Sequence, residues 1–201
     1  ISSVGGTINI VTKTTDLKEG GSIVSSVGND GYFKNLASYN TGKNENGFAA
    51  SFLMSRTAGN GYVDGTKFEG FNYFIGLGWD KGDHNFQFML TGAPQTHNQR
   101  TTSFFNMADI GDYLQYGKKY NYNHGYLNGE EFNWRQNFYH KPITSFNWSW
   151  DINETSSLTT SAYVSFGRGG GTGDIGRMGG NFASSSRFMQ NALQIHQLQE
   201  F

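Results

Sequence analysis

Several stretches of the chain alternate apolar residues with polar or small ones at a period of two. From Phe71 to Asp80 the odd-numbered positions are apolar and the even-numbered ones are mostly small or polar. After a turn at 81–83, Phe86, Phe88 and Leu90 share one face and polar residues occupy most of the other. This pattern predicts a β-hairpin with one apolar and one largely polar face.

A second hairpin is expected between residues 145 and 166, with its turn at 153–157. Another apolar row comprises Phe48, Ala50, Phe52 and Met54, and weaker alternation runs over 21–28 and 33–41. We therefore expect an all-β, antiparallel fold with about seven strands after residue 20.

The apolar faces could meet a second sheet, as in a soluble sandwich, or lipid, as in a membrane barrel. The segments 48–55, 71–79, 85–92, 143–150 and 158–166 contain no charged residue. A cation on a lipid-facing strand at mid-bilayer costs about 2–4 kcal/mol, so this distribution favours lipid. Aromatic residues near the strand ends, such as Trp79, Trp150 and Phe166, match interfacial belts.

The connections between the expected strands alternate between long and short. Long ones cover 56–70, 93–141 and the part from 167 onward, and short ones cover 81–83 and 153–157. Outer-membrane barrels have short periplasmic turns and longer extracellular loops. Seven strands would leave two open edges in hydrocarbon, so we expect other parts of a longer chain to complete the barrel.

Composition narrows the class further. Aromatic residues make up 16% of the 201 residues, and the chain has 28 glycines and two prolines. The mean hydropathy is −0.56. A spanning helix of about twenty apolar residues is excluded, whereas spanning strands of about 9–11 residues are not. A net charge of −1 without like-charge runs argues against nucleic acid as a partner. The absence of cysteine excludes disulfides and thiolate metal sites.

No constellation for catalysis, a metal or a cofactor emerges. His97, His124 and His140 show no metal-binding spacing, and the acidic residues at 109, 112, 130 and 131 lack calcium-loop spacing. The glycine-rich run 167–173 lacks the Lys-Ser/Thr ending of a phosphate loop. We therefore expect a protein that is not an enzyme and that has neither cofactor nor metal.

The opening of the chain carries the most specific motif. Its matching positions are Gly5, Gly6, Ile8, Asn9, Ile10, Thr12 and Lys13. They resemble the last plug strand of TonB-dependent receptors, with the pattern Gly-Gly-x-Ile-Asn-Ile-x-Thr-Lys. The pieces 93–100, 133–142 and 167–173 resemble receptors of the Bacteroidetes type, related to SusC-like importers.

This resemblance implies a domain plan and a function. Residues 1–13 would end a plug domain, 14–20 would form a linker, and 21–201 would begin a multi-pass outer-membrane barrel of about 22 strands. Its long extracellular loops would cover about 93–141 and 167–201. The resemblance implies import of an oligosaccharide, oligopeptide or metal chelate, energised by TonB-ExbB-ExbD, with a SusD-like surface lipoprotein as a further partner beside outer-membrane lipid. A passive porin, a structural barrel and a soluble extracellular adhesin are the alternatives.

Aromatic residues in the loop at 93–141 are the candidate ligand contacts. They are Tyr113, Tyr116, Tyr120, Tyr122, Trp134 and Tyr139. Aromatic rings beside asparagines suit sugar rings or peptide backbones, which offer apolar patches next to hydrogen-bonding groups. The alternative is that these rings pack the loop on itself, and the sequence leaves both open.

Overall fold

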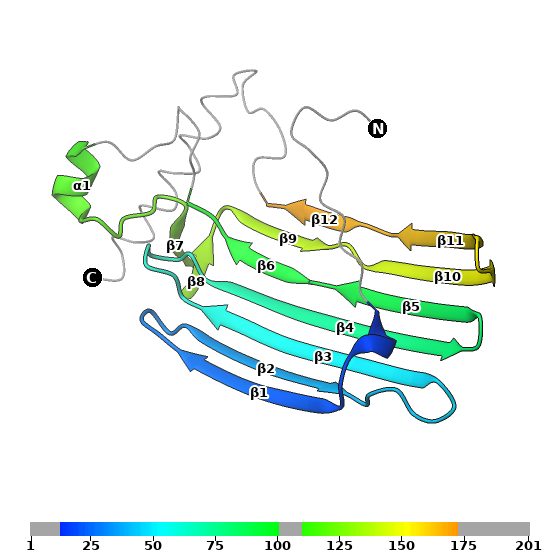
Figure 1. The fold of residues 1–201 in the computed structure, drawn as a ribbon. Helices are drawn as coiled ribbons and strands as arrows, with labels where there is room; N and C mark the ends of the chain where they lie inside the picture. Colours follow the sequence, from blue (N-terminus) through cyan, green and yellow to red (C-terminus); the bar gives the residue numbers. More distant parts are fainter. Residues whose placement is uncertain (1–12, 101–109, 173–201) are drawn as a thin grey trace, which may run out of the picture.

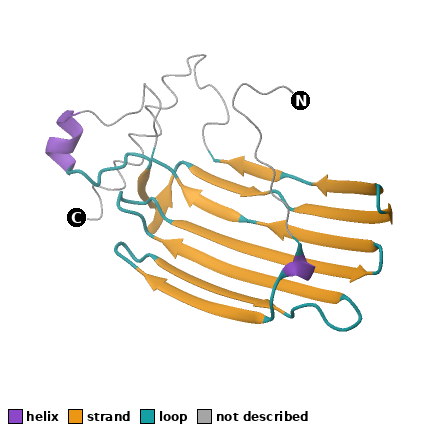
Figure 2. Cartoon of the chain, in the orientation of Figure 1, coloured by secondary structure: helices purple, strands orange, loops and turns teal. Residues whose placement is uncertain are grey.

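A computed structural model describes residues 13–100 and 110–172. It is built almost entirely from strands, as Figure 2 shows. The elements are η1 (Thr14–Asp16), β1 (Gly20–Val27), β2 (Phe33–Asn40), β3 (Phe48–Gly59), β4 (Phe68–Lys81), β5 (His84–Gly92), β6 (Gln95–Asn98), α1 (Ile110–Tyr116), β7 (His124–Leu127), β8 (Glu130–Asn133), β9 (Gln136–His140), β10 (Ile143–Asn153), β11 (Ser156–Ser165) and β12 (Arg168–Gly171). Over these ranges no helix is long and apolar enough to cross a membrane.

The strands form one antiparallel sheet in the order β1-β2-β3-β4-β5-β10-β11, to which β6, β9 and β12 also belong (Figure 1). The expected all-β antiparallel fold is confirmed, with both sequence-predicted hairpins in place. In the first, β4 ends at Lys81 and β5 begins at His84; in the second, β10 ends at Asn153 and β11 begins at Ser156. Within the described chain, β1 lies at one edge and β11 with β12 at the other.

Two prolines interrupt strands that nevertheless keep their register. On β4, Tyr73 lies opposite Gly92 of β5, and Phe68 lies opposite His97 of β6. The two residue numbers of each pair add up to the same total, so the register does not shift across Pro94. The same constancy holds between β5 and β10 and between β6 and β9, across Pro94 and Pro142. Proline has no N–H to donate to the ladder, which explains the gaps. The pairs β5–β6, β9–β10 and β11–β12 are therefore long strands with a local break.

This continuity changes where the long connection begins and ends. The sequence pattern placed a loop at about 93–141, yet pairing extends to Asn98 and resumes at Gln136. The segment between them contains α1 and the β7–β8 hairpin, which turns at Asn128 and Gly129 with φ of 57° and 81°. The glycine-rich run after residue 167 likewise starts as β12, paired with β9.

The two faces of the sheet are buried in the opposite sense to a soluble protein. On β3, Phe52 and Met54 are 45% and 70% exposed, whereas Ser51 and Ser55 on the other face are 3% and 7% exposed. We call the side that bears Phe52 and Met54 the apolar face, and the side that bears Ser51 and Ser55 the polar face.

The apolar face is continuous across the central strands. Register places Ile75 of β4 opposite Phe52 of β3 on one side and Leu90 of β5 on the other. One step along, Phe88 of β5 lies between Leu77 and Phe146 of β10. Cross-strand apolar neighbours of this kind stabilise a sheet.

Aromatic rings collect on the apolar face at the short-turn end. Phe86 stacks with Trp79 at a centroid distance of 5.5 Å and with Trp148 at 6.0 Å, and Trp148 stacks with Trp150 at 6.1 Å. The indole N–H of Trp79 donates to the Asn46 carbonyl at 3.0 Å. The indole N–H of Trp148 donates to His84 Nδ1 at 3.2 Å, so among the described residues this belt of rings has polar partners for two of its three indole N–H groups.

Three buried asparagines tie the loops to the ends of β4 and β6. Asn121, Asn123 and Asn133 are 2%, 4% and 8% exposed. Asn121 donates to the Asp64 carbonyl at 2.9 Å, and Asn133 donates to the Gly65 carbonyl at 2.9 Å. These bonds hold the connection between β3 and β4 against the segment that precedes β9.

Candidate functional site

A polar segment is anchored on the polar face mainly by Gln87, with a longer 3.4 Å hydrogen bond from the Asn85 amide to the Thr15 hydroxyl beside it. The Gln87 side chain of β5 accepts from the Thr14 backbone N–H at 2.9 Å and donates to the Thr15 hydroxyl at 2.9 Å. It also donates to the Asn85 side-chain oxygen at 3.0 Å. Thr14, Thr15 and Gln87 are 4%, 4% and 6% exposed, so these bonds are shielded from water. We call this group the linker anchor.

Two glycines of β4 make the close approach possible. A Cβ at Gly76 would lie 2.5 Å from the Thr14 hydroxyl oxygen, and one at Gly78 would lie 2.7 Å from the Thr15 methyl carbon. Gly78 also stands directly opposite Gln87 in the register. Even an alanine Cβ at either position would be too close to η1, so the threonine side chains or η1 itself would have to shift. Figure 1 shows η1 lying over the middle strands.

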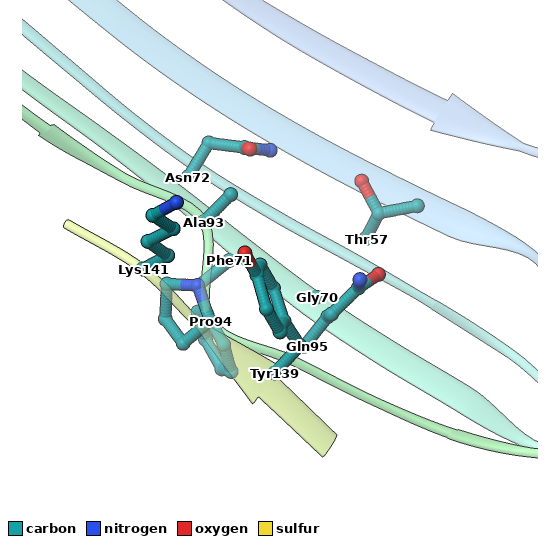
Figure 3. Close-up of a pocket in the computed structure, with 9 residues that line it drawn as sticks. All are labelled: Thr57, Gly70, Phe71, Asn72, Ala93, Pro94, Gln95, Tyr139 and Lys141. Atoms are coloured by element: carbon teal, nitrogen blue, oxygen red, sulfur yellow. The ribbon is translucent and has the colours of Figure 1, made fainter. Parts of the chain in front are cut away.

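A hollow on the polar face lies where the proline breaks open the ladder. Its volume is about 280 Å³, and its lining residues are Thr57, Gly70, Phe71, Asn72, Ala93, Pro94, Gln95, Tyr139 and Lys141. Because Pro94 lies opposite Phe71, the Phe71 N–H donates to Pro94 but the Phe71 carbonyl receives no ladder bond in return. Figure 3 shows the side chains converging from neighbouring strands. We call this hollow the polar-face pocket.

The polar-face pocket brings together one cation, two amides, a hydroxyl and a phenol. Lys141 is the only charged residue in its lining. Asn72 donates to the Ser55 hydroxyl at 3.0 Å, which leaves its side-chain oxygen as an acceptor. Tyr139 is 44% exposed and stands between Lys141 and Gln95 (Figure 3). Such a set binds polar ligands through hydrogen bonds and one ring contact.

A second hollow of about 230 Å³ lies on the apolar side of the same break, lined in part by Glu69, Phe138 and His140. Its neighbourhood is already internally paired. His140 shares a 2.9 Å hydrogen bond with the Tyr73 hydroxyl, and Arg56 forms a 2.7 Å ion pair with Glu69. The polar-face pocket is therefore the better candidate for a ligand.

The predicted loop aromatics fall into separate groups. Tyr116, Tyr120 and Tyr122 stack in sequence, with centroid distances of 4.6 and 6.2 Å. Tyr120 is 8% exposed, so its ring serves packing, while Tyr116 is 50% exposed. Packing is therefore the role of Tyr120, and a ligand contact at the exposed Tyr116 stays a prediction.

The other three predicted aromatics lie apart from this stack. The Tyr113 hydroxyl accepts from Arg100 at 2.6 Å, and Trp134 meets Phe132 edge-on at 6.1 Å. Tyr139 alone among the six lines the polar-face pocket. Of the plug-end motif, Gly5, Gly6, Ile8, Asn9, Ile10 and Thr12 lie outside the described residues, and Lys13 immediately precedes η1.

Sequence reasoning missed Gln87, Lys141, Gln95 and Asn72. Their roles depend on which residues face them across strands, and register is not visible in a single strand. One signal was present: Gly76 and Gly78, two apart on the polar face of β4, mark a close approach of another chain segment.

One ion pair ties two connections together at the short-turn end of the sheet. Lys43 forms a 2.7 Å ion pair with Asp80. Its hydrogen bond to that carboxylate, and the attraction between the two charges, raise the pKa of Lys43 above its usual value. The pair links the β2–β3 turn to the end of β4.

Comparison with known proteins adds no relative to this picture. No protein-family model, curated protein or solved structure matches the chain.

Proposed function

We propose that this chain forms part of the wall of an outer-membrane β-barrel that imports a nutrient with energy from TonB. The observation that carries the proposal is the inverted burial of the sheet. Among the described residues nothing covers the apolar face, while the polar face carries most of the buried contacts. In a membrane barrel, lipid would cover the apolar face and the polar face would line the interior.

The dimensions of the apolar face support a spanning role. From Phe71 to Trp79, eight residue steps at about 3.4 Å each cover about 27 Å along β4. At a tilt of about 40° this corresponds to about 21 Å of bilayer, close to the band of about 25 Å in known barrels. The Arg56–Glu69 ion pair lies just beyond Phe71, where the band ends.

The linker anchor supports an occluded importer over an open pore. It fixes a segment that comes before the first strand onto the face that would line the interior. A plug that precedes a barrel requires such a passage, and the resemblance at Gly5–Lys13 points the same way. TonB-ExbB-ExbD is the coupling partner in this proposal, and a SusD-like lipoprotein is the proposed surface partner. Oligosaccharides, oligopeptides and metal chelates remain the candidate cargo classes.

The test is fractionation of cells that express the full-length protein, followed by gel electrophoresis with and without boiling. Recovery in the outer membrane with a folded band that shifts on boiling is the expected result. Uptake of the cargo should then disappear in cells that lack TonB. A soluble protein without a heat shift would overturn the barrel, and uptake that persists without TonB would leave a passive porin.

A further inference from the structure

We propose that the polar-face pocket binds a sugar residue that carries a carboxylate, such as a uronic acid. The inference rests on the proposed function, because it names the chemistry of one subsite along an import path. It is carried by the charge, the polar groups and the size of the pocket, each of which is independent of membrane insertion.

The positive charge of the pocket favours an anionic ligand. Lys141 lines the pocket, and Lys34 lies on the same face directly opposite the lining residue Thr57. Within the described chain neither lysine has a carboxylate partner. Glu69, next in sequence to the lining residue Gly70, points to the apolar face and pairs with Arg56. A carboxylate of the ligand would therefore meet the Lys141 ammonium without a competing protein acid in the lining.

The remaining groups select a polar ring. Tyr139 offers an exposed ring between the Lys141 ammonium and the Gln95 amide (Figure 3). The C–H face of a sugar can lie on such a ring while its hydroxyls reach the neighbouring amides. Asn72 supplies an acceptor, and Gln95 has no side-chain hydrogen bond within the described residues. The lining mixes these polar groups with Phe71, Ala93 and Pro94, and a sugar ring matches such a mixture because its C–H face and its hydroxyls lie side by side.

The size of the pocket limits how much it holds. Its volume of about 280 Å³ is just below the range of about 300–1,000 Å³ for complete small-molecule sites. It therefore suits one sugar residue of a longer chain rather than a whole oligosaccharide.

The experiment is calorimetric titration of the detergent-solubilised full-length protein with glucuronic acid, glucose and acetate. Glucuronic acid should bind, and glucose and acetate should each bind at least about tenfold more weakly, because each lacks one half of the recognised group. Lys141→Met keeps most of the side-chain stem and should weaken the binding of glucuronic acid by about tenfold or more. Lys81→Met, at the short-turn end of β4, is the charge-matched control and should leave binding unchanged.

Each contrary outcome is decisive. Equal binding of acetate and glucuronic acid would mean that the pocket recognises only the carboxylate, which would refute recognition of a sugar. Equal binding of glucose would overturn the role of charge, as would wild-type affinity in Lys141→Met. A heat-shifted gel band verifies that each variant is folded. The band also separates the two proposals, since its loss in the wild type would refute the barrel, whereas a folded protein without glucuronate binding refutes only the subsite.

Discussion

Replacing Gln87 by alanine should release η1 from the sheet without unfolding the sheet. The substitution removes the acceptor of the Thr14 N–H and the donor to the Thr15 hydroxyl, both at 2.9 Å. It also leaves the Thr14 N–H buried without an acceptor, because Thr14 is 4% exposed. An unpaired buried donor costs about 1–3 kcal/mol, and a lost neutral hydrogen bond about 1 kcal/mol. The docked state of the segment should therefore weaken by about 2–4 kcal/mol.

Hydrogen–deuterium exchange of the peptide that contains residues 13–19 measures this change directly. A loss of about 2–4 kcal/mol corresponds to exchange that is faster by about 30- to 1,000-fold, since each 1.4 kcal/mol is a factor of ten. Asn147→Ala is the matched control, because Asn147 is an amide on the same face, directly opposite Gln87, without a recorded bond to η1. Unchanged exchange in Gln87→Ala, or equal acceleration in Asn147→Ala, would refute the anchor.

Three further substitutions or titrations test other parts of the structure. Met54 is 70% exposed on the apolar face, so Met54→Lys should destabilise the folded protein in a bilayer by about 2–4 kcal/mol and weaken the folded gel band. Ser161→Lys, on the polar face, should leave the folded band unchanged. Asn133→Ala should loosen the loops by about 1–3 kcal/mol, measured as faster proteolysis there with an intact β-sheet signal. Because the pKa of Lys43 is raised, its pairing with Asp80 stabilises the fold fully below the ordinary lysine pKa, and this stabilisation is lost as the pH rises through the raised pKa. NMR titration of the Lys43 ammonium group measures this pKa, which should return to its ordinary value in Asp80→Asn.

The alternation of side chains sufficed to predict the strands and their two faces. A period of two in 71–80 and 143–166 reports directly on which side chains share a side, and the structure pairs these segments as hairpins. Short turns were equally visible because charged and glycine residues cluster in them. These features are local, so a single chain carries them in full.

The continuity of the strands through Pro94 and Pro142 could not be predicted in the same way. A proline in a strand pattern normally marks an end, and only the constant register of both neighbours shows that pairing resumes. The polar-face pocket shares this origin. Tyr139 was identified from its ring, but Lys141 and Gln95 gain their role only from strands brought alongside.

The linker anchor also determines how tension would pass through the chain. Beyond η1, residues Leu17–Glu19 lead into β1, which is joined to β2 over eight residue pairs from Gly20 to Val27. A pull on the chain before Lys13 would load the bonds of Thr14 and Thr15 first, and these come from only two side chains, Gln87 and Asn85. They would break well below the force needed to strip β1 from the sheet. Residues 14–19 could then come away from the sheet while the wall of strands stayed whole.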